Sequence, residues 1–396
     1  MKKIIIFVLL LPSSLFAWNL SDHQQISRLA LDPVSKNWSL DKPCEVHTLS
    51  SLLVKLSQLR PDLGDPWHFS NYLKINPKTD LEKPDPILAL KKQVSPLEIL
   101  STYSIDPDDG RDQDLFQRDS HGNPHTLYPD QKWFGALQGG NSQAFRHIEK
   151  PPFDWKHPIS TFGFPFRAVG EATQRAEIYY QLSLLAFSVD EDYWGWRFLA
   201  GSFHYLEDLH QPYHAGQVTP KLLGRGLLAY VTWGWKKYGF MGTMSHLVSN
   251  SHRFFESYVS QPILENQKVK AEANHSLEGK KEDPFPSSVK DLALQIRDDS
   301  NRVFPQLLSA VGELTDSKLY GPYEFRSDDP DASHPEDFLD RGPAFLSANQ
   351  KIFEITKNRF QSAGERLRTV THQVLKQRSQ EKSEKILSRL DFLLGK

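Results

Sequence analysis

The sequence contains one cysteine, Cys44, in 396 residues. A single cysteine cannot form an intrachain disulfide, so the fold must be stabilised by its core or by a bound group such as a metal ion. Charge is also nearly balanced: 47 basic against 49 acidic residues give −2 at pH 7. This balance provides no overall attraction to nucleic acid or to an anionic membrane. Any affinity for phosphate must therefore be local.

The apolar run Ile4–Leu11 is far shorter than the ~20 residues that a membrane-spanning helix needs. It follows Lys2 and Lys3, and small residues ending at Ala17 come after it, which is typical of a secretory signal peptide. We therefore expect residues 1–17 to be removed and the protein to be secreted or periplasmic. An uncleaved anchor or a buried N-terminal helix is the alternative.

No convincing β-hairpin signal or internal repeat is present, and apolar residues recur mainly at helical spacing. The sequence predicts an all-α fold, a multi-helix single domain. A helical pattern also runs from Trp18 to about Leu73, whereas 101–165 is rich in Asp, Gly and Pro and predicts a long loop region. The main helices are expected at 166–188, 193–210, 240–262, 289–312 and 343–378.

The polar segment 266–288 is expected to be a mobile connector. It would separate a catalytic region, 18–265, from a helical C-terminal extension, 289–396. The last part of that extension, 379–396, is expected to be a charged amphipathic tail.

One predicted helix carries two metal-ligand side chains on the same face. His204 and Asp208 are four residues apart, so they lie one above the other and can hold one ion. Ala200, one turn earlier, indicates that this face is buried. Pro212 cannot continue the helix, so the chain turns and His214 can approach from another direction. By itself the pattern leaves a metal site and an ordinary core role both open.

Two further groups have the residue types of metal ligands. His252 and Glu256 are again four apart on a predicted helix, where an exposed ion pair is the alternative. Cleavage after Ala17 would free the amino group of Trp18, whose ordinary pKa near ~8 lets a metal displace its proton at little cost. That amine, the Trp18 carbonyl and the imidazole of His23 could chelate an ion; otherwise both residues are structural.

Together these residues resemble the superfamily of zinc-dependent phospholipases C and single-strand-specific nucleases. In that superfamily, the first residue after signal cleavage is a tryptophan that binds zinc through its amino and carbonyl groups. A histidine, an H-x-x-x-D-x-x-x-x-x-H helix and an H-x-x-x-[DE] pair follow. The same elements occur here in that order between Trp18 and about Tyr258, and the tract WGWRFLAGSFHYLEDLHQPYHAG is the most specific part.

The resemblance implies one more aspartate and one more histidine before the central helix. We assign the aspartate to Asp108, in the loop SIDPDDG, and the histidine to His147, in QAFRH. Neighbouring aspartates are alternatives for the first: Asp106, Asp109 and Asp112. Two other histidines are alternatives for the second, in this order: His121 and His68.

Carried over residue by residue, the resemblance implies three zinc ions. The first would be held by Asp108, His147, His204 and Asp208. The second would be held by Trp18, His23 and Asp208, which makes Asp208 a bridge. The third would be held by His214, His252 and Glu256, with positions open for water and phosphate. Asp108 is also the candidate general base, and manganese or iron would suit the same ligand set.

The superfamily hydrolyses phosphodiesters, so we expect a hydrolase of phosphoric ester bonds that is a monomer. Glu256 stands where nucleases are expected to have an aspartate, which favours a phospholipase C acting on glycerophospholipids. Nucleic acid is the alternative substrate, and a zinc-stabilised exported protein without catalysis is a third interpretation. The aromatic-rich segment Leu227–Phe240 predicts either a peripheral membrane contact or a buried helix.

Overall fold

The computed structural model describes residues 20–63, 91–108, 146–152, 168–236, 239–259, 267–279, 281–315, 317–322, 325 and 343–393. Within these ranges the chain is mostly helical, which confirms the predicted all-α class. The described strands form only two antiparallel pairs of two residues each. β1 (Cys44–Glu45) pairs with β2 (Gln93–Val94), and β3 (Glu149–Lys150) pairs with β4 (Val169–Gly170).

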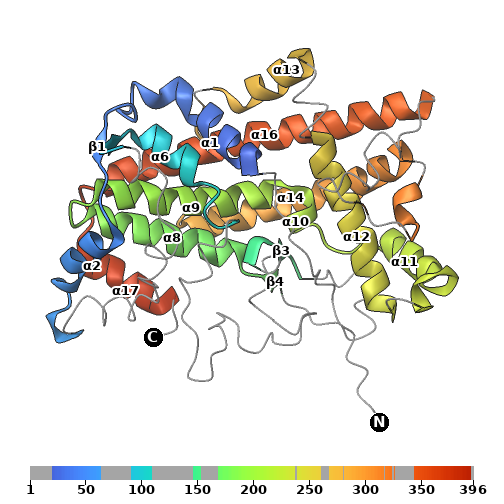
Figure 1. Cartoon of the computed structure of the whole chain (residues 1–396), viewed down its shortest axis with the longest axis horizontal. Coiled ribbons are helices and arrows are strands. Elements are labelled where there is room, and N and C mark those ends of the chain that lie inside the picture. The colour runs from blue at the N-terminus through green and yellow to red at the C-terminus, as the bar shows by residue number, and fades with distance from the viewer. Residues whose placement is uncertain are drawn as a thin grey trace, which may run out of the picture.

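Two buried helices, α8 (Ala172–Phe187) and α9 (Asp192–His210), lie side by side at the centre of the molecule (Figure 1). Both are buried on nearly all sides, as expected for helices that are apolar around their circumference. Their axes approach closely at Gly201, where an added Cβ would come within 2.4 Å of the Tyr179 ring. Glycine is therefore required at this position for the two helices to pack at this distance.

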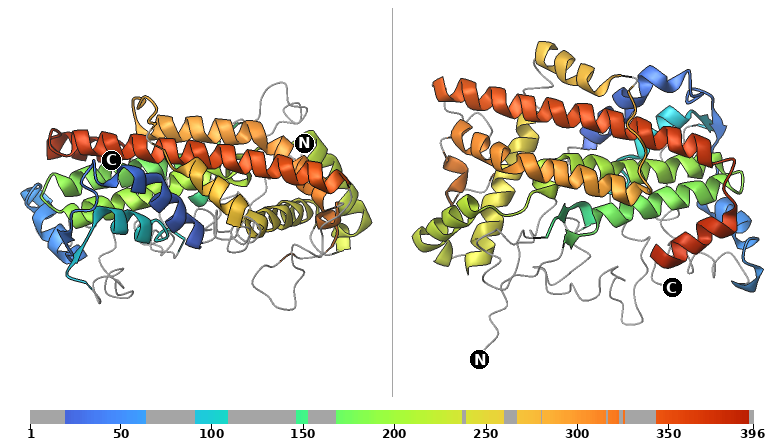
Figure 2. Two further views of the ribbon diagram at one scale, coloured as in Figure 1. Left: turned by 90° about the horizontal axis from the view of Figure 1, so that it is seen from above. Right: turned by 180° about the vertical axis from the view of Figure 1, so that it is seen from behind.

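Helices from both ends of the sequence cover the central pair (Figures 1 and 2). These are α1 (Leu20–Ser35), α6 (Pro96–Tyr103), α14 (Val289–Leu314), α16 (Pro343–Gln377) and α17 (Ser383–Leu393). Their buried apolar residues belong to one continuous core together with those of α8 and α9. The predicted C-terminal extension is thus part of the same helical body.

Helices α11 (Pro220–Thr232) and α12 (Gly239–Tyr258) lie together at the right of the molecule in Figure 1. In the chain, α10 (Pro212–Ala215) connects α9 to α11, and the 3-10 helix η6 (Gly234–Lys236) connects α11 to α12. Short elements complete the described chain: α2 (Leu49–Ser57) and the 3-10 helices η1 (Pro61–Leu63) and η8 (Lys318–Tyr320). Among the described residues, no helix combines the length and the apolar character needed to cross a membrane.

The expected helix boundaries agree with those observed within a few residues, with one clear exception. The helix expected at 166–188 begins only at Ala172, because Val169 and Gly170 pair with β3 instead. The expected 101–165 loop region is described only at its two ends, and the rest lies outside the described residues.

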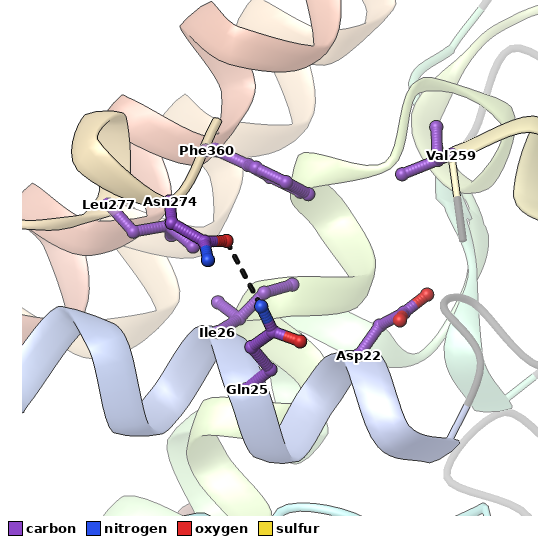
Figure 3. Close-up of a pocket in the computed structure, with 7 residues that line it drawn as sticks. All are labelled: Asp22, Gln25, Ile26, Val259, Asn274, Leu277 and Phe360. Atoms are coloured by element: carbon purple, nitrogen blue, oxygen red, sulfur yellow. Dashed lines mark hydrogen bonds between the residues drawn. The ribbon is translucent and has the colours of Figure 1, made fainter. Parts of the chain in front are cut away.

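The expectation of a mobile connector at 266–288 is wrong for its first half. Residues Gln267–Leu277 form α13, which packs against α1 and α16. Ala273 and Leu277 are four residues apart and fully buried, so a narrow apolar stripe suffices to dock an otherwise polar helix. Gln25 of α1 donates a hydrogen bond to Asn274 across this contact, with 3.0 Å between Nε2 and Oδ1 (Figure 3).

A cavity of about 20 Å³ lies between α1, α13 and α16 (Figure 3). Its lining includes Asp22, Ile26 and Phe360. A space of this size holds about one water molecule and is far too small for an organic substrate.

His210, at the end of α9, connects the central pair to α16. Its Nδ1 donates to the carbonyl oxygen of Leu206 at 2.7 Å, and its Nε2 lies 3.2 Å from the hydroxyl of Ser362. Burial, with Arg359 nearby, lowers the pKa of His210 to about 3. The folded protein therefore keeps this imidazole neutral at pH values where the unfolded chain is protonated.

We expect His210→Asn to flatten the pH dependence of stability. Between pH 6.5 and pH 3, His210 binds a proton in the unfolded chain but stays neutral in the folded protein. The free energy of unfolding therefore falls as pH falls. The loss is up to ~1.4 kcal/mol per pH unit for one such group. Denaturant titrations at pH 6 and pH 5 should show a smaller difference for the variant than for the wild type; equal differences would contradict this role.

Candidate metal centre

The predicted ligands from distant parts of the sequence meet at the ends of the central helices. Three buried groups of side chains have the composition and spacing to hold metal ions. The first group is His147, His204 and Asp208, which Asp108 joins; the second is His23, Asp108 and His204; and the third is His214, His252 and Glu256. They come from α1, the turn after α6, the residues just before β3, and helices α9, α10 and α12.

The first group has the dimensions of one tetrahedral site. The four atoms concerned are Asp108 Oδ1, His147 Nδ1, His204 Nε2 and Asp208 Oδ2. Five of the distances that join them are 2.8, 2.9, 3.2, 3.6 and 3.7 Å. Ligand atoms at about 2.1 Å from a tetrahedral ion lie about 3.4 Å apart, so these residues fit a shared ion.

His23 faces the opposite oxygens of the same two carboxylates. Its Nε2 lies 3.7 Å from Asp108 Oδ2 and 3.7 Å from Asp208 Oδ1. No hydrogen-bond partner satisfies this buried nitrogen. Each carboxylate therefore presents one oxygen to the first group and one to His23, which is the arrangement of a bridging ligand.

The third group lies nearest to solvent. His252 Nε2 and Glu256 Oε1 approach to 2.8 Å, yet neither atom makes a hydrogen bond, and His214 Nε2 also has no partner. Two buried nitrogens and a carboxylate oxygen that converge without bonding one another fit a common cation. The Glu256 side chain is 14% exposed, whereas those of the other two groups are fully buried. Access from outside is therefore through the third group.

Buried acceptors fix the orientation of three of these imidazoles. His23 Nδ1 lies 2.6 Å from Glu207 Oε2, His204 Nδ1 lies 2.7 Å from the Ser104 carbonyl, and His214 Nδ1 lies 2.7 Å from the His147 carbonyl. In each case Nδ1–H donates outward, so Nε2 directs its lone pair toward the centre. Metal-binding histidines are characteristically held in this way.

The electrostatics of the centre also favour ligand forms of these side chains. Burial lowers the pKa of His23, His147, His214 and His252, so these imidazoles are neutral near pH 7. Neutral imidazole is the form that binds metals. Burial also raises the pKa of Glu256, and the charge of Arg253 and a hydrogen bond from Gln211 oppose this shift.

Among the alternatives, the described residues bring together Asp108 and His147. Asp106 instead pairs with Arg197, whose Nη2 lies 3.0 Å from its Oδ2, and it belongs to none of the three groups. The remaining predicted candidates lie outside the described residues: Trp18, His68, Asp109, Asp112 and His121.

Two supporting residues were not predicted from the sequence. Glu207 accepts hydrogen bonds from His23 and from the hydroxyl of Ser27, at 2.6 Å each. Lys150 is buried and donates to the carbonyls of Tyr213 and Gly216, which fixes α10 and the His214 that it carries. Burial lowers the pKa of Lys150 to about 8.

The position of Glu207 was a usable signal, because it precedes Asp208 on a helix whose face was already predicted to be buried. A buried carboxylate needs a partner, and the outward-facing nitrogen of a histidine at the centre is one way to provide it. No comparable signal marks Lys150, whose role depends on the position of α10.

Comparisons with protein-family models, with curated proteins and with solved structures gave no match.

Proposed function

We propose that the protein is an exported zinc-dependent phosphodiester hydrolase, most specifically a phospholipase C acting on glycerophospholipids. The observation that carries the proposal is the centre itself: five buried histidines and three carboxylates whose ligand atoms converge in three groups. Nitrogen and carboxylate ligands without cysteine suit zinc at a hydrolytic site. We propose three bound ions, and the presence of three such groups supports this number.

Zinc bound in these groups would lower the pKa of a water toward ~7 and neutralise the phosphate as charge develops. The protein contributes the positions of the ligands. Glu207 holds His23, the Ser104 carbonyl holds His204, and Tyr213 stacks on His252 with 5.4 Å between ring centroids. In the proposed reaction the Asp108 carboxylate accepts the proton of the attacking water.

A phosphodiester would enter through the third group, because Glu256 is its most accessible ligand. Glu256 also favours a phospholipid over nucleic acid as the substrate, because the related nucleases are expected to have an aspartate at this position. A nuclease or nucleotidase with the same centre is the alternative activity. A zinc-stabilised protein without catalysis is the alternative from a different class.

Parallel assays on choline phospholipid, single-stranded DNA and single-stranded RNA test the proposal. We expect phosphorylcholine release and zinc bound to the purified chain. His252→Gln should abolish turnover, whereas His246→Gln, on the same helix but outside the three groups, should retain it. Turnover of nucleic acid alone would assign the alternative substrate, and bound zinc with no turnover would assign the non-catalytic role.

A further inference from the structure

Helix α11 and the 3-10 helix η6 expose a row of large apolar side chains. Leu227, Leu228 and Val231 are 56%, 66% and 63% exposed, and Trp235 is 57% exposed. In the part of the chain that the structure describes, the other prominently exposed large apolar residues are Val54 and Phe392, on α2 and α17. We call the four residues of α11 and η6 the α11 surface.

The opposite face of α11 already has its partner within the fold. Leu222, Gly226 and Ala229 are buried, and an added Cβ at Gly226 would overlap Met244 of α12. The α11 surface is therefore a second apolar face, beyond what packing of the helix requires. Contiguous exposed apolar side chains of this kind mark a binding surface.

The charge of this region differs sharply from that of the whole chain. No aspartate or glutamate occurs between Asp208 and Glu256, whereas this stretch contains five basic residues: Lys221, Arg225, Lys236, Lys237 and Arg253. Lys221 and Lys236 are exposed, and Lys236 Nζ lies 5.3 Å from the centroid of the Trp235 ring. The sequence on both sides of this apolar row thus contains basic residues and no acidic ones.

This combination fits an anionic lipid surface better than a protein partner. Tryptophan is enriched at the boundary between acyl chains and headgroups, and lysine extends its charge toward headgroup phosphates. Lysine is depleted from protein interfaces, which argues against a protein partner as the occupant.

We propose that the α11 surface docks onto membranes that contain anionic phospholipid. The apolar row would enter the headgroup region, and Lys221 and Lys236 would contact lipid phosphates. The use of docking for catalysis rests on the proposed function, whereas the docking itself does not. Helix α12 packs against α11 and carries His252 and Glu256. Docking would keep the accessible third group at a lipid surface.

Co-sedimentation of the full chain with vesicles tests this proposal. One set of vesicles contains phosphatidylcholine alone, and the other contains added phosphatidylglycerol. We expect preferential binding to the second set, weakened by salt. The double substitution Leu228→Ser and Val231→Ser should lower the partition coefficient by about tenfold or more. Phe392→Ser, which removes an exposed apolar residue from α17, should leave the partition coefficient unchanged. All variants are prepared with the same N-terminus as the wild type, so that differences in binding come from the substitutions.

Binding of the double variant equal to that of the wild type would overturn the proposal. Failure of the wild type to bind either set of vesicles would overturn it too. If in that case the wild type self-associates and the double variant does not, the α11 surface would be assigned to contact with a second copy of this chain. Asp208→Asn separates docking from catalysis, because that variant should lose turnover and keep vesicle binding. Vesicle binding by a wild type without lipid turnover would refute the phospholipase activity alone.

Discussion

Removing bound metal with a chelator should lower the unfolding temperature by on the order of 10 °C or more. The reason is the concentration of ionisable groups in a buried centre. Burial raises the pKa of Glu207, and the nearby carboxylates of Asp208 and Asp108 raise it further. Without cations, buried carboxylates repel one another and imidazole nitrogens lose their ligand bonds. Metal binding is therefore expected to contribute directly to folding.

Calorimetry with and without chelator measures this effect. Returning zinc should restore the original unfolding temperature, whereas magnesium should not, because it is a poor ion for imidazole ligands. An unfolding temperature that is insensitive to chelator would show that the centre is stable without metal. The experiment does not depend on which substrate the protein hydrolyses.

The ligand pairs within helices were predictable because helical geometry is local. His204 with Asp208, and His252 with Glu256, needed only the 3.6-residue period and a correct helix assignment. The break at Pro212 likewise placed His214 on a separate element, α10. The central helices were predictable because their long apolar segments have few competing structures.

The meeting of these pairs with His23, Asp108 and His147 could not be obtained from periodicity. It depends on how α1, the turn after α6 and β3 pack onto α9, and the assignment of Asp108 and His147 came from resemblance. Helix α13 was missed because its buried stripe is narrow and its composition is polar. The sequence could not decide whether the segment that forms the α11 surface contacts lipid or is buried. A helix that is apolar on both faces has the same sequence pattern whether its second face meets lipid or protein.

Replacing Asp208 by Asn should have the largest effect on the centre, since its two oxygens face different groups. Oδ2 lies 2.9 Å from His147 Nδ1 and 3.2 Å from His204 Nε2, while Oδ1 lies 3.7 Å from His23 Nε2. An amide keeps one oxygen, removes the negative charge and directs N–H donors at one of the two groups.

We therefore expect Asp208→Asn to lose two of the three proposed ions and to reduce turnover by about 10³-fold or more. Glu207→Gln is the matched control, because it removes the same charge from the adjacent, equally buried position. Glu207 accepts a hydrogen bond from His23 and belongs to none of the three groups. This control should lower the affinity for one ion by about 10- to 100-fold, because Glu207 orients a histidine without reaching the ion, and it should leave the other two ions bound. Metal analysis and turnover of the two variants together distinguish a bridging carboxylate from a merely buried one, and full metal content in Asp208→Asn would refute the bridge.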